Sequence, residues 1–165
     1  PWPTSTRRTA PRGSSRAAAA AGSTPARAAA RATGQPAIAD DSGIEAAALG
    51  GAPGVRSARF AGEHATDEQN LARLLREAPA GSPLAYVCAL AYVNPQDGAE
   101  RLVEGRCSGR LDARPRGAGG FGYDPAFLPD DVDDGRTMAE LAPAEKDAIS
   151  HRGRAARALL ALLDS

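Results

Sequence analysis

The sequence predicts an α/β fold in which a largely antiparallel or mixed sheet is flanked by helices. Residues 84–93 are dense in Tyr, Val and Cys, and residues 101–111 supply a second strand after the turn-forming residues 94–98. This order of strand, turn and strand indicates a β-hairpin. Residues 66–69 (Thr-Asp-Glu-Gln) have the spacing of a helix capping box, so a helix is expected to precede the hairpin.

The helices are predicted from apolar spacing and from residues that begin or end a helix. Leu71, Leu74 and Leu75 form the stripe of an amphipathic helix that ends near residue 78. Alanine and arginine favour a helix over residues 26–33, and Gly34 is expected to cap its end.

The C-terminal part of the chain is expected to hold two more helices. Pro143 suits the first position of a short helix over residues 145–149. Ser150 is expected to cap the last helix, whose leucines 159, 160 and 163 are predicted to face the core.

Composition divides the 165 residues into two unequal parts. Residues 1–39 carry six arginines, no acidic residue, and only Trp2 and Ile38 as apolar residues larger than alanine. Such a stretch buries too little surface to offset its ordering entropy, so residues 1–25 are predicted to be disordered or non-native. Residues 26–165 are predicted to form a single domain.

Charge and cysteine content exclude several classes of protein. Formal charge cancels at 20 basic against 20 acidic groups, which argues against a membrane surface or a stable nucleic-acid partner. No apolar run is long enough to span a membrane, and no signal peptide opens the chain. Cys88 and Cys107 are too few for a disulfide framework and lack metal-ligand spacing, so a cytoplasmic location is expected.

The first candidate site lies at residues 40–43. Residues 36–39 are expected to form a buried strand that ends in the polar loop Asp40-Asp41-Ser42-Gly43. Carboxylate oxygens in such a loop suit Mg²⁺ and a general base. Adjacent side chains of an extended chain point to opposite faces, so one carboxylate would face the site and the other would support it. An Asx-type turn explains the same tetrapeptide without chemistry.

A glycine-rich loop over residues 119–125 is the second candidate. It places Phe121 and Tyr123 among glycines that allow close backbone approach, which indicates a stacking surface for a flat ligand. A hydrophobic corner at the start of a strand is an equally good explanation of this spacing.

The third candidate is a cluster of cationic groups near the C-terminus. Lys146 is the only lysine beside 19 arginines, and residues 150–152 (Ser-His-Arg) begin a helix where an anion would be favoured. A lone lysine also arises by chance, and a histidine at a helix start is often merely exposed. His64 has no partner in the sequence and is assigned no role.

Taken in order, these segments resemble the Ham1/RdgB family of inosine/xanthosine triphosphate pyrophosphatases. The resemblance rests on residues 39–43 followed by 49–55 and 57–60, on residues 120–125 with Phe127, and on residues 145–146 with 149–152. It covers residues 26 to the C-terminus. The family's fold is a mixed sheet with flanking helices, in two lobes around a central cleft.

The resemblance implies an enzyme that hydrolyses dITP, ITP or XTP to the monophosphate and pyrophosphate, with Mg²⁺, and that forms a homodimer. Asp41 matches the family's metal-binding and water-activating acid. The matching substrate-binding residues are Ser42, Phe121, Gly122, Tyr123, Asp124, Lys146, His151 and Arg152.

The chain departs from the family before Asp40. The family opens with a strand and a Thr/Ser-x-Asn-x-x-Lys phosphate loop and supplies a glutamate from a Glu-Asn-Ala helix, whereas residues 1–39 contain neither an acid nor a lysine. Weak nucleotide binding and slow turnover are therefore expected, with a truncated or frame-shifted N-terminus as the interpretation. Two alternatives stay open: a Maf-like pyrimidine nucleotide pyrophosphatase, and a non-catalytic nucleotide- or nucleic-acid-binding protein.

Overall fold

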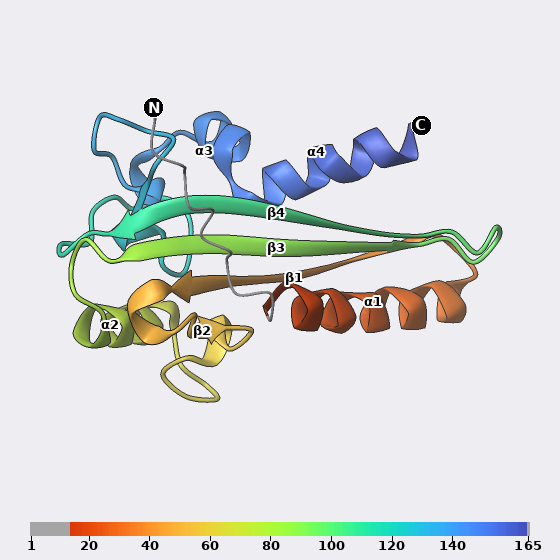
Figure 1. The fold of residues 1–165 in the computed structure, drawn as a ribbon, viewed down its shortest axis with the longest axis horizontal. Helices are drawn as coiled ribbons and strands as arrows, with labels where there is room; N and C mark the ends of the chain where they lie inside the picture. The colour runs from red at the N-terminus through yellow and green to blue at the C-terminus, as the bar shows by residue number, and fades with distance from the viewer. Residues whose placement is uncertain (1–13, 165) are drawn as a thin grey trace, which may run out of the picture.

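The structure is a computed structural model that describes residues 14–164. Five strands form one sheet in the order β2-β1-β3-β4-β5 (Figure 1). Their bounds are β1 Ala37–Ala46, β2 Pro53–Gly54, β3 Pro83–Val93, β4 Glu100–Leu111 and β5 Phe127–Pro129. Every pairing in this sheet is antiparallel. The predicted α/β class is confirmed, and of the two sheet types left open the described residues show the antiparallel one.

Two long helices cover opposite faces of the sheet (Figure 1). Helix α1 (Ser14–Thr33) packs Ala26 and Ala30 against Ala91 and Val93 of β3. Helix α4 (His151–Leu163) packs instead against the even-numbered side chains of β3, such as Cys88 and Leu90. Successive strand side chains alternate between faces, so each face of β3 holds one helix.

The larger core lies at the other end of the sheet. Helix α2 (Asp67–Glu77) and the short helix α3 (Pro143–Ile149) flank this end. Its buried hydrophobic side chains come from α2, from β1, β3, β4 and β5, and from residues 123–141. The members buried to 2% exposure or less are Ile44, Ala46, Leu74, Cys107, Leu111, Ala126, Phe127 and Met138. This core fixes the glycine-rich loop against the sheet.

The predicted polar loop at residues 40–43 is wrong, because β1 continues through it to Ala46. Asp40, Asp41, Ser42 and Gly43 pair in register with β3. On its other side β1 pairs with β2 only at Ile44 and Glu45, so within the described residues this segment is a sheet edge. An edge keeps one side open to solvent, which is why a strand tolerates three polar residues here.

Helix α1 is longer than the sequence indicated. It begins at Ser14 and runs through Pro25. Residues 14–25, which were predicted to be disordered or non-native, are helical backbone in the structure, and residues 1–13 lie outside the described residues. The predicted end is confirmed: Gly34 adopts φ +66° and its N–H donates to the carbonyl oxygen of Ala30 at 2.9 Å.

The other helix signals are confirmed with one correction. The Thr66 hydroxyl accepts from the Gln69 N–H while the Gln69 side chain accepts from the Thr66 N–H, which completes the capping box. Ser150 caps α4 through the Gly153 N–H at 3.0 Å. Leu159 is buried, but Leu160 and Leu163 are 59% and 41% exposed, so their predicted core position is wrong. The sheet lies on one side of α4 only; on the opposite side Arg157 donates to the carbonyl oxygens of Asp147 and Ala148 in α3, while Leu160 and Leu163 stay exposed.

A glycine on β4 brings α4 close to the sheet. A Cβ placed on Gly105 would lie 2.0 Å from the carbonyl oxygen of His151 and 2.5 Å from the backbone nitrogen of Ala155. No larger residue fits without moving α4, since such contacts are far inside van der Waals distance. Gly105 therefore sets the position of the first turn of α4, and with it His151.

None of the helices in the described part of the chain is both long and apolar enough to cross a membrane. Cys88 and Cys107 are buried and form no disulfide.

Candidate functional site

A pocket of about 160 Å³ lies where β1 and β3 meet the glycine-rich loop and the start of α4. Six of the predicted site residues line it: Ser42, Phe121, Gly122, Tyr123, His151 and Arg152. The remaining lining residues are Gly43, Ile44, Ser57, Ala58, Asp67 and Tyr86. The fold thus brings together residues from three separate segments of the sequence.

Phe121 presents a half-exposed aromatic face between two cations. The Nζ of Lys146 lies 4.6 Å from the centre of its ring, and the guanidinium carbon of Arg152 lies 5.2 Å from it. Cations at these distances are attracted by the ring quadrupole and hold its position. An exposed ring with flanking donors suits a flat, polar ligand such as a nucleobase.

Asp124 is buried behind the pocket, and three protein donors share its carboxylate. Its Oδ1 accepts from the Tyr86 hydroxyl at 3.0 Å, and its Oδ2 accepts from the Phe121 N–H at 2.8 Å and from Lys146 Nζ at 2.5 Å. With 2% of the residue exposed, this carboxylate orients the protein groups around it. The lysine that composition singled out is therefore the partner of a buried acid.

His151 is buried at the start of α4 and is neutral near pH 7. Burial, and to a lesser extent the nearby Arg152, lowers the pKa of its imidazole to about 4. Its ring stacks on Tyr86 with centroids 4.7 Å apart and planes 9° apart. A neutral imidazole offers one donor and one acceptor nitrogen. Its Nδ1 is buried and has no hydrogen-bond partner among the described residues.

The same pKa shift predicts that acid destabilises the protein through His151. The unfolded chain takes up a proton on this histidine near pH 6.5, whereas the folded protein does so only near pH 4. The stabilisation is complete above about pH 6.5 and is lost as pH falls toward 4, by up to about 3 kcal/mol. Urea unfolding of wild type and His151→Asn across this range should show the steeper loss in wild type. His64→Asn, which changes the exposed histidine, should keep the wild-type slope.

The two adjacent aspartates lie on opposite faces of β1. Asp40 shares the pocket face with Ser42, whose hydroxyl donates to Asp40 Oδ1 at 2.5 Å. Asp40 Oδ2 accepts from Arg152 Nε at 2.9 Å. Asp41 pairs with Ala89 on the face that α1 covers, and it has no hydrogen bond or ion pair with the described residues. The predicted catalytic acid thus lies on the opposite face of the sheet from the pocket.

Six lining residues were not among the predicted site residues, and three of them, Ser57, Asp67 and Tyr86, make hydrogen bonds that position the site. The Ser57 backbone carbonyl accepts from the Tyr123 hydroxyl at 2.7 Å, and the Asp67 carboxylate accepts from the Gly122 N–H at 2.7 Å. Both contacts fix the glycine-rich loop from distant segments. Tyr86, the third, could have been found from strand alternation, which puts it on the same face as Cys88 and opposite Ile44.

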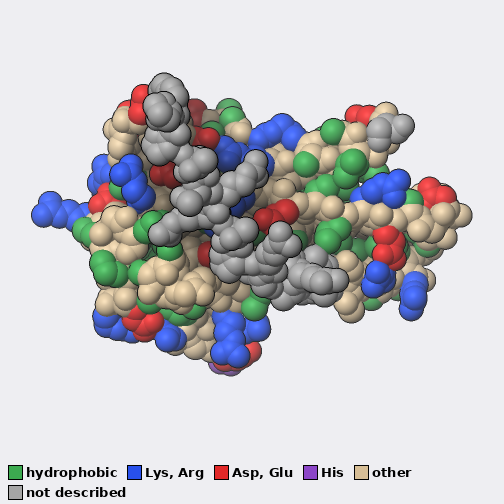
Figure 2. Space-filling view, in the orientation of Figure 1, with side chains coloured by type: hydrophobic (Ala, Val, Ile, Leu, Met, Phe, Trp, Pro, Cys, Tyr) green, Lys and Arg blue, Asp and Glu red, His purple; other side chains and the backbone are tan. Residues whose placement is uncertain are grey.

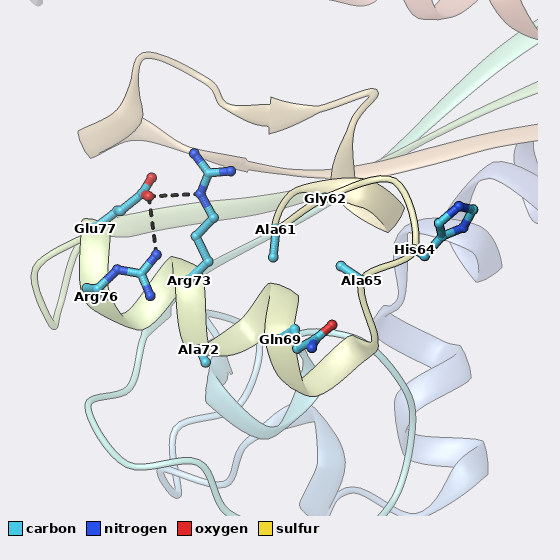
Figure 3. A pocket seen from close by; sticks show the side chains of 9 residues that line it. All are labelled: Ala61, Gly62, His64, Ala65, Gln69, Ala72, Arg73, Arg76 and Glu77. Atoms are coloured by element: carbon cyan, nitrogen blue, oxygen red, sulfur yellow. Dashed lines mark hydrogen bonds and ion pairs between the residues drawn. The ribbon is translucent and has the colours of Figure 1, made fainter.

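A second, more open cavity lies between α2 and the loop before it, and Figure 3 shows the side chains around it. Its volume is about 710 Å³. Its two arginines, Arg73 and Arg76, both bridge to Glu77, and His64 points away from them (Figure 3). No residue of the three candidate segments lines this cavity. The smaller pocket is therefore the candidate active site.

Comparison with known proteins decides the family. The Ham1 family profile matches residues 14–162. The chain belongs to the Ham1 family. Among curated relatives, this Ham1 chain is 52% identical over 136 residues to a dITP/XTP pyrophosphatase of Mycolicibacterium paratuberculosis, covering 80% of the chain and 65% of that protein. It is also 52% identical over 127 residues to one of Geobacillus kaustophilus, covering 73% of the chain and 60% of that protein. The chain thus spans less than two thirds of the length of these relatives.

Solved Ham1 structures share the fold. A HAM1 protein from Coxiella burnetii aligns with TM-score 0.76 at 43% identity, covering 84% of this chain and 72% of that one. A nucleoside-triphosphatase / dITP/XTP pyrophosphatase from Mycobacterium abscessus aligns with TM-score 0.70 at 42% identity, covering 99% and 81%. These matches confirm the family resemblance on which the sequence interpretation depends.

Proposed function

We propose that this chain hydrolyses non-canonical purine nucleoside triphosphates, dITP, ITP and XTP, to the monophosphate and pyrophosphate. The observation that carries the proposal is the pocket around Phe121, where an aromatic face is flanked by Lys146 and Arg152. Relatives about half identical to the chain are named dITP/XTP pyrophosphatases, which supports this choice of substrate.

Base selection follows from the donors around Phe121. Inosine and xanthine carry a 6-oxo acceptor, whereas adenine carries a 6-amino donor. Lys146 and Arg152 are permanent donors, so an amino group placed opposite them would leave a donor unpaired. Each such mismatch costs about 1–3 kcal/mol, or about ten- to a hundredfold in selectivity.

The phosphates are proposed to cross the open edge of the sheet. Because β2 pairs with β1 only at Ile44 and Glu45, the segment from Asp40 to Gly43 has no strand partner on this edge within residues 14–164. A nucleotide with its base in the pocket extends over this edge toward the α1 face, where Asp41 lies. Asp41 is half-buried and has no hydrogen bond or ion pair with the described residues, as a water-activating carboxylate needs.

The site is also proposed to use Mg²⁺. No group of three or more Asp, Glu, His or Cys side chains within residues 14–164 is arranged to hold a metal ion. Mg²⁺ in phosphate chemistry is commonly held by one or two carboxylates together with substrate oxygens and water, and the Asp41 carboxylate fits that role. When bound, Mg²⁺ supplies neutralisation of the charge on the phosphates. With no acidic residue on α1, Asp41 has no second carboxylate from that helix, consistent with weak binding.

The residues divide the reaction between binding and proton transfer. Asp41 accepts a proton from the water that attacks the phosphorus next to the ribose, and the bond to the β-phosphoryl oxygen breaks. The products are a nucleoside monophosphate and pyrophosphate. Phe121, Tyr123 and Gly122 hold the base, His151 and Arg152 close the pocket, and Ser42 contacts the substrate beside Asp40.

Pyrophosphate release from a panel of nucleotides tests this function. With Mg²⁺ present, kcat/KM for dITP and XTP is expected to exceed that for dATP by at least about tenfold, even where the absolute rate is low. Preference for dTTP or UTP would support the Maf-like alternative instead. Binding that falls steeply with salt and is unaffected by Asp41→Asn, with no turnover, would support a nucleic-acid-binding protein. Including dGTP in the panel shows whether guanine, which shares the 6-oxo group, is rejected.

A homodimer and a cytoplasmic location complete the proposal. Leu160 and Leu163 share one side of α4 and are 59% and 41% exposed, and Figure 2 shows hydrophobic side chains at the surface in this region. Such a patch suits contact with a second copy. Light scattering of the purified chain gives its mass in solution, and a monomer at all concentrations would contradict the dimer.

A further inference from the structure

Tyr86 connects the two halves of the candidate base site. It lies on β3, is 5% exposed, and lines the pocket between the glycine-rich loop and the start of α4. Its hydroxyl contacts Asp124 and its ring contacts His151. We propose that Tyr86 is a positioning residue that sets base specificity by holding Asp124 and His151 in fixed positions relative to each other. This inference rests on the proposed function.

The hydroxyl acts through Asp124. Burial, followed by the Asp124 charge, raises the pKa of Tyr86 well above its ordinary value, so the phenol stays a donor. Its hydrogen bond to Oδ1, at 3.0 Å, leaves Oδ2 for the Phe121 N–H and for Lys146. Without the hydroxyl, Oδ1 has no other donor among the described residues, and the carboxylate can rotate. Rotation would move both the ammonium and the aromatic ring that are proposed to meet the base.

The ring acts on His151. The two rings stack nearly parallel, and Phe127, which is fully buried, contacts the Tyr86 ring at 4.7 Å and 37°. Phe127 therefore fixes the Tyr86 ring from the core, and the stacked Tyr86 ring fixes the plane of the His151 imidazole. Because the imidazole is neutral, its plane decides where its single donor and single acceptor point.

A single side chain thus relates donors from two separate elements. Lys146 and Phe121 are placed through the hydroxyl, and His151 is placed through the ring. Discrimination between a 6-oxo and a 6-amino group needs these donors fixed relative to one another, since a donor that can move aside no longer penalises the wrong base. Removing the hydroxyl alone should therefore loosen Lys146 and Phe121 and leave His151 in place.

The test compares Tyr86→Phe with wild type and with Tyr92→Phe. Tyr92 lies on the same face of the same strand, and no hydrogen bond of its hydroxyl is part of the site, so its variant is a matched control. Steady-state kinetics with dITP and dATP give kcat and KM, and calorimetry with IMP gives binding without turnover. Tyr86→Phe is expected to raise KM for dITP and Kd for IMP about tenfold, with kcat changed less than about threefold. The ratio of kcat/KM for dITP to kcat/KM for dATP should fall in Tyr86→Phe. Tyr92→Phe should match wild type in all of these values.

A double-mutant cycle with Asp124→Asn shows whether the hydroxyl acts through Asp124. In the Asp124→Asn background, removing the hydroxyl should change KM by less than about twofold, because the bond it supports is already altered. Since Tyr86→Phe keeps the buried ring, its melting temperature is expected to fall by only about 2–4 °C. Unchanged KM, Kd and base ratio in folded Tyr86→Phe would overturn this inference alone. Wild type that neither binds IMP nor hydrolyses dITP would instead overturn the proposed function.

Discussion

Asp41→Asn is expected to lower kcat for dITP by about 10²–10⁴-fold while the protein remains folded. The amide keeps the size of the side chain but cannot accept the proton of the attacking water. Asp41 has no hydrogen bond or ion pair with the described residues, so the substitution breaks no stabilising contact. Pyrophosphate release under saturating dITP measures the rate, and circular dichroism with a thermal melt confirms folding.

Asp40→Asn is the matched control, because it makes the same change in the adjacent residue, whose carboxylate has hydrogen-bond partners and lies on the other face of β1. Asp40 pairs with Arg152 and accepts from Ser42 on the pocket face. Its loss is expected to free Arg152 and to change KM for the base more than kcat. If Asp40→Asn removes turnover and Asp41→Asn does not, the water-activating role belongs to Asp40, and the assignment of Asp41 fails.

Much of the fold was predictable because local signals and tertiary packing agree. The capping box at Thr66, the turn after β3 and the Ser150 cap each satisfy backbone groups within a few residues, so a single sequence displays them. Strand β1 was predicted too short because its middle, from Asp40 to Ser42, is polar. Only the ten-residue register with β3, a long-range contact, makes those polar residues a strand.

For Leu160 and Leu163 the sequence predicted too much burial, because both were expected to face the core and both are exposed. Apolar spacing predicts a buried helix face, but it cannot say which of the leucines on α4 meets the sheet. Gly105 brings the first turn of α4 onto β4, and Leu159 then lies on the inner side while Leu160 and Leu163 do not.

The site was predictable only where a residue carries its own signal. Phe121, Tyr123, His151 and Arg152 were identified from composition and motif, and the structure places all four around one pocket. Strand alternation could have placed Tyr86 on the pocket face, but a tyrosine in an apolar strand is typical of a core residue and does not by itself indicate a role in a site. Its role depends on contacts with residues 38 and 65 positions away, which no local pattern contains.

Asp124→Ala is expected to destabilise the protein by about 3 kcal/mol and to raise KM for dITP. The substitution leaves the ammonium of Lys146 without its partner at 2.5 Å and removes the acceptor for the Tyr86 hydroxyl and the Phe121 N–H. An unpaired, largely buried cation is costly because water reaches it poorly, and the Lys146 side chain is only 20% exposed. Urea unfolding monitored by circular dichroism measures the loss.

The double variant Asp124→Ala/Lys146→Met distinguishes the cost of the unpaired Lys146 charge from the loss of the groups that shape the site. Methionine matches the length of the lysine stem without its charge, so the double variant is expected to recover about half or more of the lost stability. It should not recover KM, because both the donor near Phe121 and the anchor of the loop are then gone. A single variant that loses less than about 1 kcal/mol, or a double variant less stable than the single, would mean that the buried pair does not hold the glycine-rich loop.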